Sequence, residues 1–317
     1  MSFKIKTVFL LLLLLAAAGV QAQSKNKKGE KLTPEAIEKL HTGEDTLALL
    51  AYAVVNDSVE QERFAACRAL IQTLVRTLKV ENSFQYQFDR LKSVSILAPP
   101  DSSFRIFTWQ LFVNDSTYRY YGAIQMNSRA LKLFPLIDRS EDMDERPVFE
   151  QMPPEKWYGA LYYNLRQFDT KEGRKYLLFG YDAYAFFEKR KLIDVLSFDA
   201  AGKPVFGAAV FDKPKMKVPE MRLLFEYPSE ASIRVNWDEL YQMVIFDHLI
   251  PWPSAYGRGM VAVPDGSYDA LRLEPNGRWK FIDKVFNDVQ DEAPRPEPVL
   301  DARKDKDIIG KEKKKKG

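Results

Sequence analysis

The spacing of apolar residues along the chain changes once, near residue 92. Between residues 33 and 91 they recur at steps of three and four, which is the period of an α-helix with one buried face. The clearest such face contains Phe64, Cys67, Leu70, Ile71, Leu74, Val75 and Leu78. From Ser93 onward the period becomes two, which indicates β-strands. The pattern therefore predicts a helical region over 33–91 and a β-rich region over 92–290.

The start of the helical region carries a recognisable sequence signal. Thr33 can cap a helix with its hydroxyl, and Pro34 suits the first helical position, where an amide hydrogen would lack an intrahelical partner. We expect a short helix from Pro34 to about His41 that ends near Gly43, because glycine is common just past a helix end. A second helix is expected over the apolar stretch 47–54.

A third helix is predicted to begin at residues 57–60, whose sequence is DSVE. This segment resembles a capping box, in which Asp57 accepts from the first amides and Glu60 reaches back to the capping residue. Cys67 lies on the apolar face of this helix. We expect its thiol to be buried and to behave as a small apolar group.

Short polar turns between the β-like segments predict antiparallel hairpins. In residues 105–113 alternate side chains fall on one face, and Asn114-Asp115 precedes a returning segment over 118–126. Similar turns occur at 169–173, 200–202 and 276–277. Parallel neighbours need a crossover of about a dozen residues, so these loops favour antiparallel pairing. The predicted fold is α+β, with an N-terminal helical region followed by a large antiparallel β domain, either a sandwich or an open meander.

The first 22 residues have the organisation of a cleavable signal peptide. Lys4 and Lys6 form a charged start, an apolar run follows from Val8 to Val20, and Ala22 ends a short segment suited to peptidase cleavage. The apolar run is shorter than the roughly 20 residues that span a bilayer. We therefore expect an exported protein, periplasmic or associated with the cell envelope, with no transmembrane span in its mature form.

Charge is concentrated at the two ends of the predicted mature chain. The whole chain is +3, whereas residues 23–32 form a basic linker and residues 303–317 contain eight basic and three acidic residues. The body between them is acidic, and nucleic-acid binding is not expected because it needs a basic surface on the folded domain. Residues 291–317 are expected to form a proline-containing linker and a disordered, lysine-rich tail.

Two interpretations of the lysine-rich tail remain open. The run Lys311, Lys313, Lys314, Lys315 and Lys316 can keep the protein soluble as a solvated segment. It can also attach the protein to an anionic envelope surface, since each lysine near such a surface contributes about 1 kcal/mol.

Few residues suggest catalysis. The chain has one cysteine and two histidines, and it contains none of the common zinc, phosphate-binding or serine-hydrolase motifs. With a single cysteine it forms no intramolecular disulfide. Carboxylate pairs such as Asp265 and Asp269 are expected by chance among 44 acidic residues. No catalytic residue, metal or cofactor is predicted.

One segment is a candidate ligand site. His248 ends an apolar strand, and the following loop contains Trp252, Tyr256 and Arg258, whose rings and charge could bind a sugar or peptide. Asp247 is not expected to pair with His248, since neighbours on a strand point to opposite faces. The alternative is a histidine that donates to a backbone carbonyl beneath a loop that only covers the sheet.

Four segments resemble a known group of proteins: 179–182, 196–207, 247–251 and 264–269. Together they are similar to conserved uncharacterised exported proteins of the Bacteroidota. That resemblance implies an exported location and carries no assigned activity. We expect a non-catalytic binding or envelope-assembly protein; the alternative is a hydrolase that acts on envelope glycan or peptide, with a site near His248.

Overall fold

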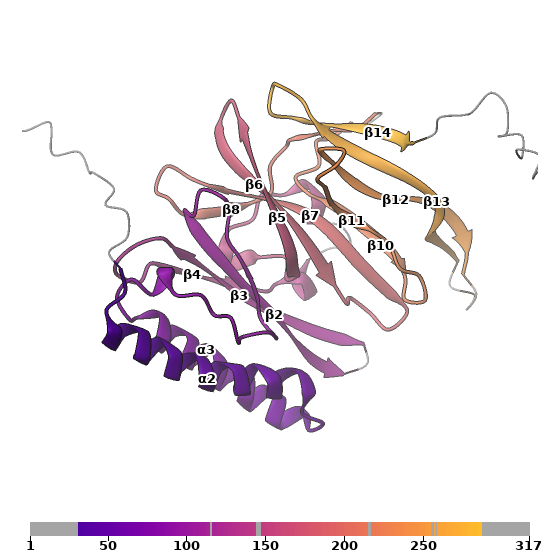
Figure 1. The fold of residues 1–317 in the computed structure, drawn as a ribbon. Helices are drawn as coiled ribbons and strands as arrows, with labels where there is room; N and C mark the ends of the chain where they lie inside the picture. Colours follow the sequence, from indigo (N-terminus) through magenta and orange to yellow (C-terminus); the bar gives the residue numbers. More distant parts are fainter. Residues whose placement is uncertain are drawn as a thin grey trace, which may run out of the picture.

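The structure is a computed structural model that describes residues 31–286, apart from residues 115, 144–146, 215–216, 255–256 and 258. A helical hairpin and three β-sheets lie in successive layers (Figure 1). The predicted α+β fold, with helices first and antiparallel sheets after them, is confirmed. None of the helices in these described ranges is long and apolar enough to cross a membrane.

Helix α2 runs without interruption over Pro34–Asn56, so the prediction of two helices separated near Gly43 is wrong. The Thr33 hydroxyl caps the helix as predicted, accepting from the Ala36 amide at 3.2 Å. Gly43 lies in mid-helix against Thr77, and a Cβ built there would stand 2.4 Å from the Thr77 Oγ1 atom. This glycine allows close contact between two helices and does not end one.

Helix α3 spans Glu60–Leu78 and packs beside α2. Its capping residue is Val59, and Asp57 accepts from the Val59 amide at 2.8 Å. The reciprocal capping box is therefore absent from this helix start. Cys67 is buried as predicted, with 2% of its surface exposed, among the residues between the helices and the first sheet.

The first sheet has the order β1-β2-β3-β4 and follows the short 3-10 turn η1 (Ser83–Gln85). Its strands are β1 (Ser95–Leu97), β2 (Phe104–Asn114), β3 (Thr117–Met126) and β4 (Leu133–Ile137). β2 and β3 form the hairpin predicted around residue 114. Phe107, Trp109 and Leu111 of β2 face the helices, and Phe104 and Ile106 face the second sheet. The first sheet is therefore buried on both sides.

Three 3-10 turns connect the first sheet to the second: η2 (Ser140–Asp142), η3 (Pro147–Phe149) and η4 (Pro154–Lys156). The second sheet has the order β10-β7-β6-β5, and β8 pairs with β7 beside β10. Its strands are β5 (Leu161–Thr170), β6 (Gly173–Asp182), β7 (Glu188–Phe198), β8 (Pro204–Phe206) and β10 (Leu223–Pro228). Alternate residues of β6 enter the cores on either side of this central sheet.

The third sheet has the order β11-β12-β13-β14-β9. Its strands are β11 (Val235–Asp238), β12 (Met243–Pro253), β13 (Met260–Leu273), β14 (Trp279–Val285) and β9 (Phe211–Asp212). β9 pairs with β14 in parallel, unlike the antiparallel hairpins that the short loops predicted. The ends of β12 and β13, over 249–253 and 260–264, pair only with each other and form a two-stranded arm.

Candidate functional site

His248 lies where the third sheet departs from regular pairing. The register between β12 and β13 shifts between Asp247 and Leu249, so that His248 has no regular partner and residues 265–267 bulge from β13. A second shift between Tyr268 and Ala270 leaves Asp269 out of register with β14. β-bulges redirect side chains and are frequent beside functional sites. Here they bring together residues from three adjacent strands.

The side-chain partner of His248 is Asp269, which the sequence had not indicated. Its Nδ1 atom lies 3.0 Å and 2.9 Å from the two carboxylate oxygens of Asp269. The same nitrogen lies 3.9 Å from Oδ1 of Asp283. Asp247 bonds instead to the backbone amide of Arg234, as expected for a residue on the other face. Nδ1 of His248 therefore contacts a carboxylate and not a backbone carbonyl.

Nearby groups hold these carboxylates in place. The Lys284 amide donates to Oδ1 of Asp269 at 3.0 Å, and 9% of the Asp269 side chain is exposed. Asp265 accepts from the hydroxyl and amide of Ser267 at 2.6 Å and 2.9 Å. These hydrogen bonds, together with the charges of His248 and Lys284, hold the pKa of Asp265 below its ordinary value.

The other candidate residues do not join this cluster in the described part of the chain. Trp252 lies four residues beyond His248, about 13 Å along an extended strand, and 58% of its surface is exposed on the arm. Tyr256 and Arg258 lie outside the described residues, as does the lysine-rich tail. Their predicted roles in binding a ligand or an anionic surface stay predictions.

A long groove lies between the second sheet and the arm, and we call it the β10 groove. Its volume is about 500 Å³. It is lined by residues 148–149, Glu188, Lys213, Glu220, residues 223–227, Leu249, Pro251 and residues 260–262. Five consecutive residues of β10 contribute to it, although successive side chains on a strand point to opposite faces. The groove therefore follows the edge of β10 itself.

The edge of β10 that faces the groove is unpaired. The Ser229 amide donates to the Phe187 carbonyl at 2.9 Å, so these two residues form a hydrogen-bonded pair of the β10–β7 ladder. Hydrogen-bonded and non-hydrogen-bonded pairs alternate along an antiparallel ladder. Leu224 and Glu226 therefore direct their backbone groups away from β7. Pro228 occupies the next such position, which suits a residue without an amide hydrogen. No described residue outside β7 bonds to the backbone of 223–227.

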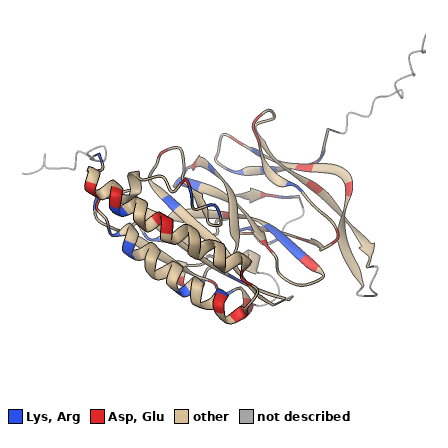
Figure 2. Cartoon of the chain, turned by 60° about the horizontal axis from the view of Figure 1, so that its bottom comes forward, with Lys and Arg blue, Asp and Glu red and all other residues tan. Residues whose placement is uncertain are grey.

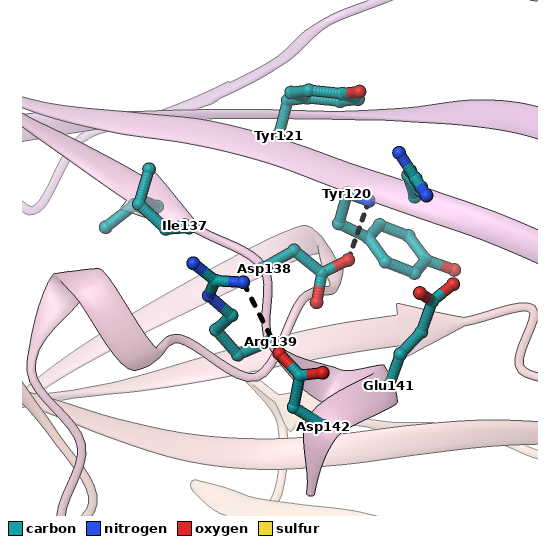
Figure 3. A pocket seen from close by; sticks show the side chains of 9 residues that line it. Tyr120, Tyr121, Ile137, Asp138, Arg139, Glu141 and Asp142 are labelled. Atoms are coloured by element: carbon teal, nitrogen blue, oxygen red, sulfur yellow. Dashed lines mark hydrogen bonds and ion pairs between the residues drawn. The ribbon is translucent and has the colours of Figure 1, made fainter.

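A second cavity, of about 300 Å³, lies beside Asp138 at the end of β4 (Figure 3). Asp138 accepts hydrogen bonds from the amides of Tyr120, Ser140 and Gly159 at 2.9, 3.0 and 3.2 Å. A Cβ on Gly159 would lie 2.3 Å from this carboxylate. Arg139 beside it pairs with Asp142 at 3.4 Å. These bonds assign Asp138 to joining β3, the η2 turn and the segment that leads into β5.

Acidic and basic positions are interspersed over the helices and strands in the view of Figure 2. Many of them form pairs across neighbouring elements, such as Arg174 with Asp101 and Arg190 with Glu226, at 3.1 Å and 2.7 Å. In the described ranges these charges mainly connect elements of the fold.

Comparison with known proteins adds no assignment to these sites. The chain matches no protein-family model, and no curated protein or solved structure is significantly similar to it.

Proposed function

We propose that this protein is an exported, non-catalytic binding protein that takes up an extended segment of a partner protein along the edge of β10. The observation that carries the proposal is the unpaired edge of β10 within a groove of about 500 Å³. An extended peptide adds to such an edge through main-chain hydrogen bonds, while side pockets select its side chains.

The groove walls suit a peptide with alternating apolar and polar side chains. Phe149 and Leu224 supply apolar surface from the second-sheet side, and Pro251 and Ala262 supply it from the arm. Glu188, Glu220 and Glu226 outnumber the one lysine, Lys213, among the charged residues of the lining. Glu226 pairs with Arg190 and Glu220 with Lys213, so the apolar surface and the β10 edge, more than net charge, would select the segment.

The unpaired edge also explains why a protein partner is preferred to a small molecule. Exposed strand edges are generally blunted because they recruit other strands. Pro228 and the η3 segment block the two ends of this edge, since the Val148 carbonyl accepts from the Met221 amide at 2.6 Å. Between them, no described residue outside β7 bonds to the backbone of Leu224 and Glu226, which would limit added pairing to a short segment.

The test compares two substitutions at one edge position. Glu226→Pro removes the backbone N–H that faces the groove, whereas Glu226→Ala removes the same carboxylate and keeps the N–H. Both lose the ion pair with Arg190, so they are matched in that respect. The probe is a set of random twelve-residue peptides displayed on phage and selected on the wild-type protein, followed by fluorescence anisotropy with the selected peptides.

We expect the affinities of the selected peptides for the wild type and for Glu226→Ala to agree within a factor of about three. Their affinity for Glu226→Pro should be at least about tenfold lower, because one to two hydrogen bonds are lost. Hydrogen exchange at Leu224 and Glu226 should slow when peptide is bound. Failure to enrich any peptide, or equal binding by the two variants, would contradict the proposal.

A further inference from the structure

The cluster around His248 supports an inference that is independent of the β10 groove. Within the described residues, His248, Asp269 and Asp283 are the one group of three or more histidine, cysteine and carboxylate side chains whose ligand atoms converge. These three atoms all lie within 4.8 Å of one another. They come from β12, β13 and β14, so the cluster spans three adjacent strands.

The arrangement brings two carboxylates together at one point. Asp269 is buried and already contacts His248 at 2.9 Å. The Asp283 side chain is 68% exposed and could extend into solvent, yet its Oδ1 atom lies 3.9 Å from the same imidazole nitrogen. The ligand atoms of Asp269 and Asp283 lie within 4.8 Å of each other, and carboxylates this close repel each other unless a cation lies between them.

The ligand atoms suit a particular class of cation. One imidazole nitrogen and two carboxylate oxygens form a mixed nitrogen and oxygen set, which favours zinc, cobalt, manganese or iron over calcium, which binds through oxygen alone. A tetrahedral zinc ion holds its ligands about 2.0 Å away and so about 3.3 Å from one another. Side-chain movements of about 1 Å bring the three atoms to that separation.

A supporting hydrogen bond is also in place. Metal-bound carboxylates are generally oriented by a donor on their second oxygen. The Lys284 amide donates to Oδ1 of Asp269 at 3.0 Å, while Oδ1 and Oδ2 lie 3.0 Å and 2.9 Å from Nδ1 of His248. The same backbone bulge that places Lys284 opposite Asp269 places Asp283 beside it.

We propose that His248, Asp269 and Asp283 bind one divalent transition-metal cation at the base of the arm. Three protein ligands leave at least one coordination position for water. Bound metal would join β12, β13 and β14 and resist their separation, so it should stabilise the third sheet.

The experiment uses purified protein without a polyhistidine tag, because such a tag binds the same ions. Zn²⁺ binding is measured by isothermal titration calorimetry, and Co²⁺ binding by the visible absorption of the bound ion. The chain has only two histidines, and His41 forms a similar surface contact with Asp45 at 3.6 Å. His41→Ala is therefore a matched control that removes the other imidazole.

The wild type and His41→Ala should each bind one Zn²⁺ and unfold at a higher temperature when Zn²⁺ is present. His248→Gln should lose this binding and the temperature shift. Asp283→Asn changes an exposed side chain and leaves the fold intact, so its expected effect, a loss of affinity of about tenfold or more, tests the site without a change of structure.

Three outcomes would overturn the proposal. They are a wild type that Zn²⁺ does not saturate at one equivalent, a loss of binding in His41→Ala instead of in His248→Gln, and an Asp283→Asn variant that binds Zn²⁺ as the wild type does. None of the three affects peptide binding in the β10 groove, so the two proposals fail separately.

Discussion

The ion pair between Asp194 and Arg222 offers a strong test of how the layers are held together. Both side chains have no exposed surface, and the Arg222 Nε atom lies 3.1 Å from Asp194 Oδ1. Arg222 also donates to the carbonyls of Pro147 and Glu150, which join the η3 segment to the start of β10. We predict that Asp194→Asn is strongly destabilising, because it leaves the guanidinium charge buried without its counterion.

The expected magnitude follows from the bonds that remain. Removing one partner of a buried ion pair costs about 3 to 5 kcal/mol. Asparagine retains an oxygen that can accept from the Val195 amide, now at 2.8 Å, and Arg222 retains its two carbonyl acceptors. These contacts place the loss near the lower limit, about 3 kcal/mol. That is a large share of the 5 to 15 kcal/mol by which folded domains are stable.

The assay is equilibrium unfolding in urea, followed by tryptophan fluorescence, with Trp157 and Trp279 buried in two different cores. The double variant Asp194→Asn with Arg222→Gln should lose less stability than the two single variants added together, since neither charge is then left alone. As a control, Glu35→Gln breaks an exposed helical ion pair with Lys39 and should leave the urea midpoint unchanged. A loss below about 1 kcal/mol for Asp194→Asn would refute the reasoning, because it is the value of an exposed pair.

Three further changes test local features of the fold. Cys67→Ser should lower the free energy of unfolding in urea by about 1 to 3 kcal/mol, since it buries a hydroxyl. Burial also raises the pKa of the Cys67 thiol, so a bulky thiol reagent should label the native wild type slowly. Gly43→Ala should lower the thermal midpoint despite the higher helix propensity of alanine, because its Cβ meets Thr77 at 2.4 Å, and adding Thr77→Ala should restore part of the loss. Arg278 holds the pKa of Asp212 below its ordinary value through hydrogen bonds and charge. Asp212→Asn should therefore be less stable than the wild type at pH 7, and this difference in stability should disappear as the pH falls below the ordinary aspartate value. A difference in stability that does not change with pH would contradict this.

The sequence predicted those features of the fold that depend on neighbouring residues. The change of period near residue 92, the Thr33 cap and the hairpin around residue 114 all follow from local backbone geometry, and each is present. The prediction failed at Gly43, where a residue that often ends helices serves a contact with Thr77, 34 positions away. Local propensity was outweighed there by helix packing.

The candidate sites depended on contacts that no local pattern contains. His248 stood out in the sequence, but its partner Asp269 is 21 residues away and is brought to it by two bulges in neighbouring strands. The β10 groove had no sequence signal, because the edge position of β10 results from the strand order of the second sheet. Strand order and bulges are selected by the burial of both sheet faces between residues far apart in sequence, whereas periodicity reflects the geometry of only a few consecutive residues.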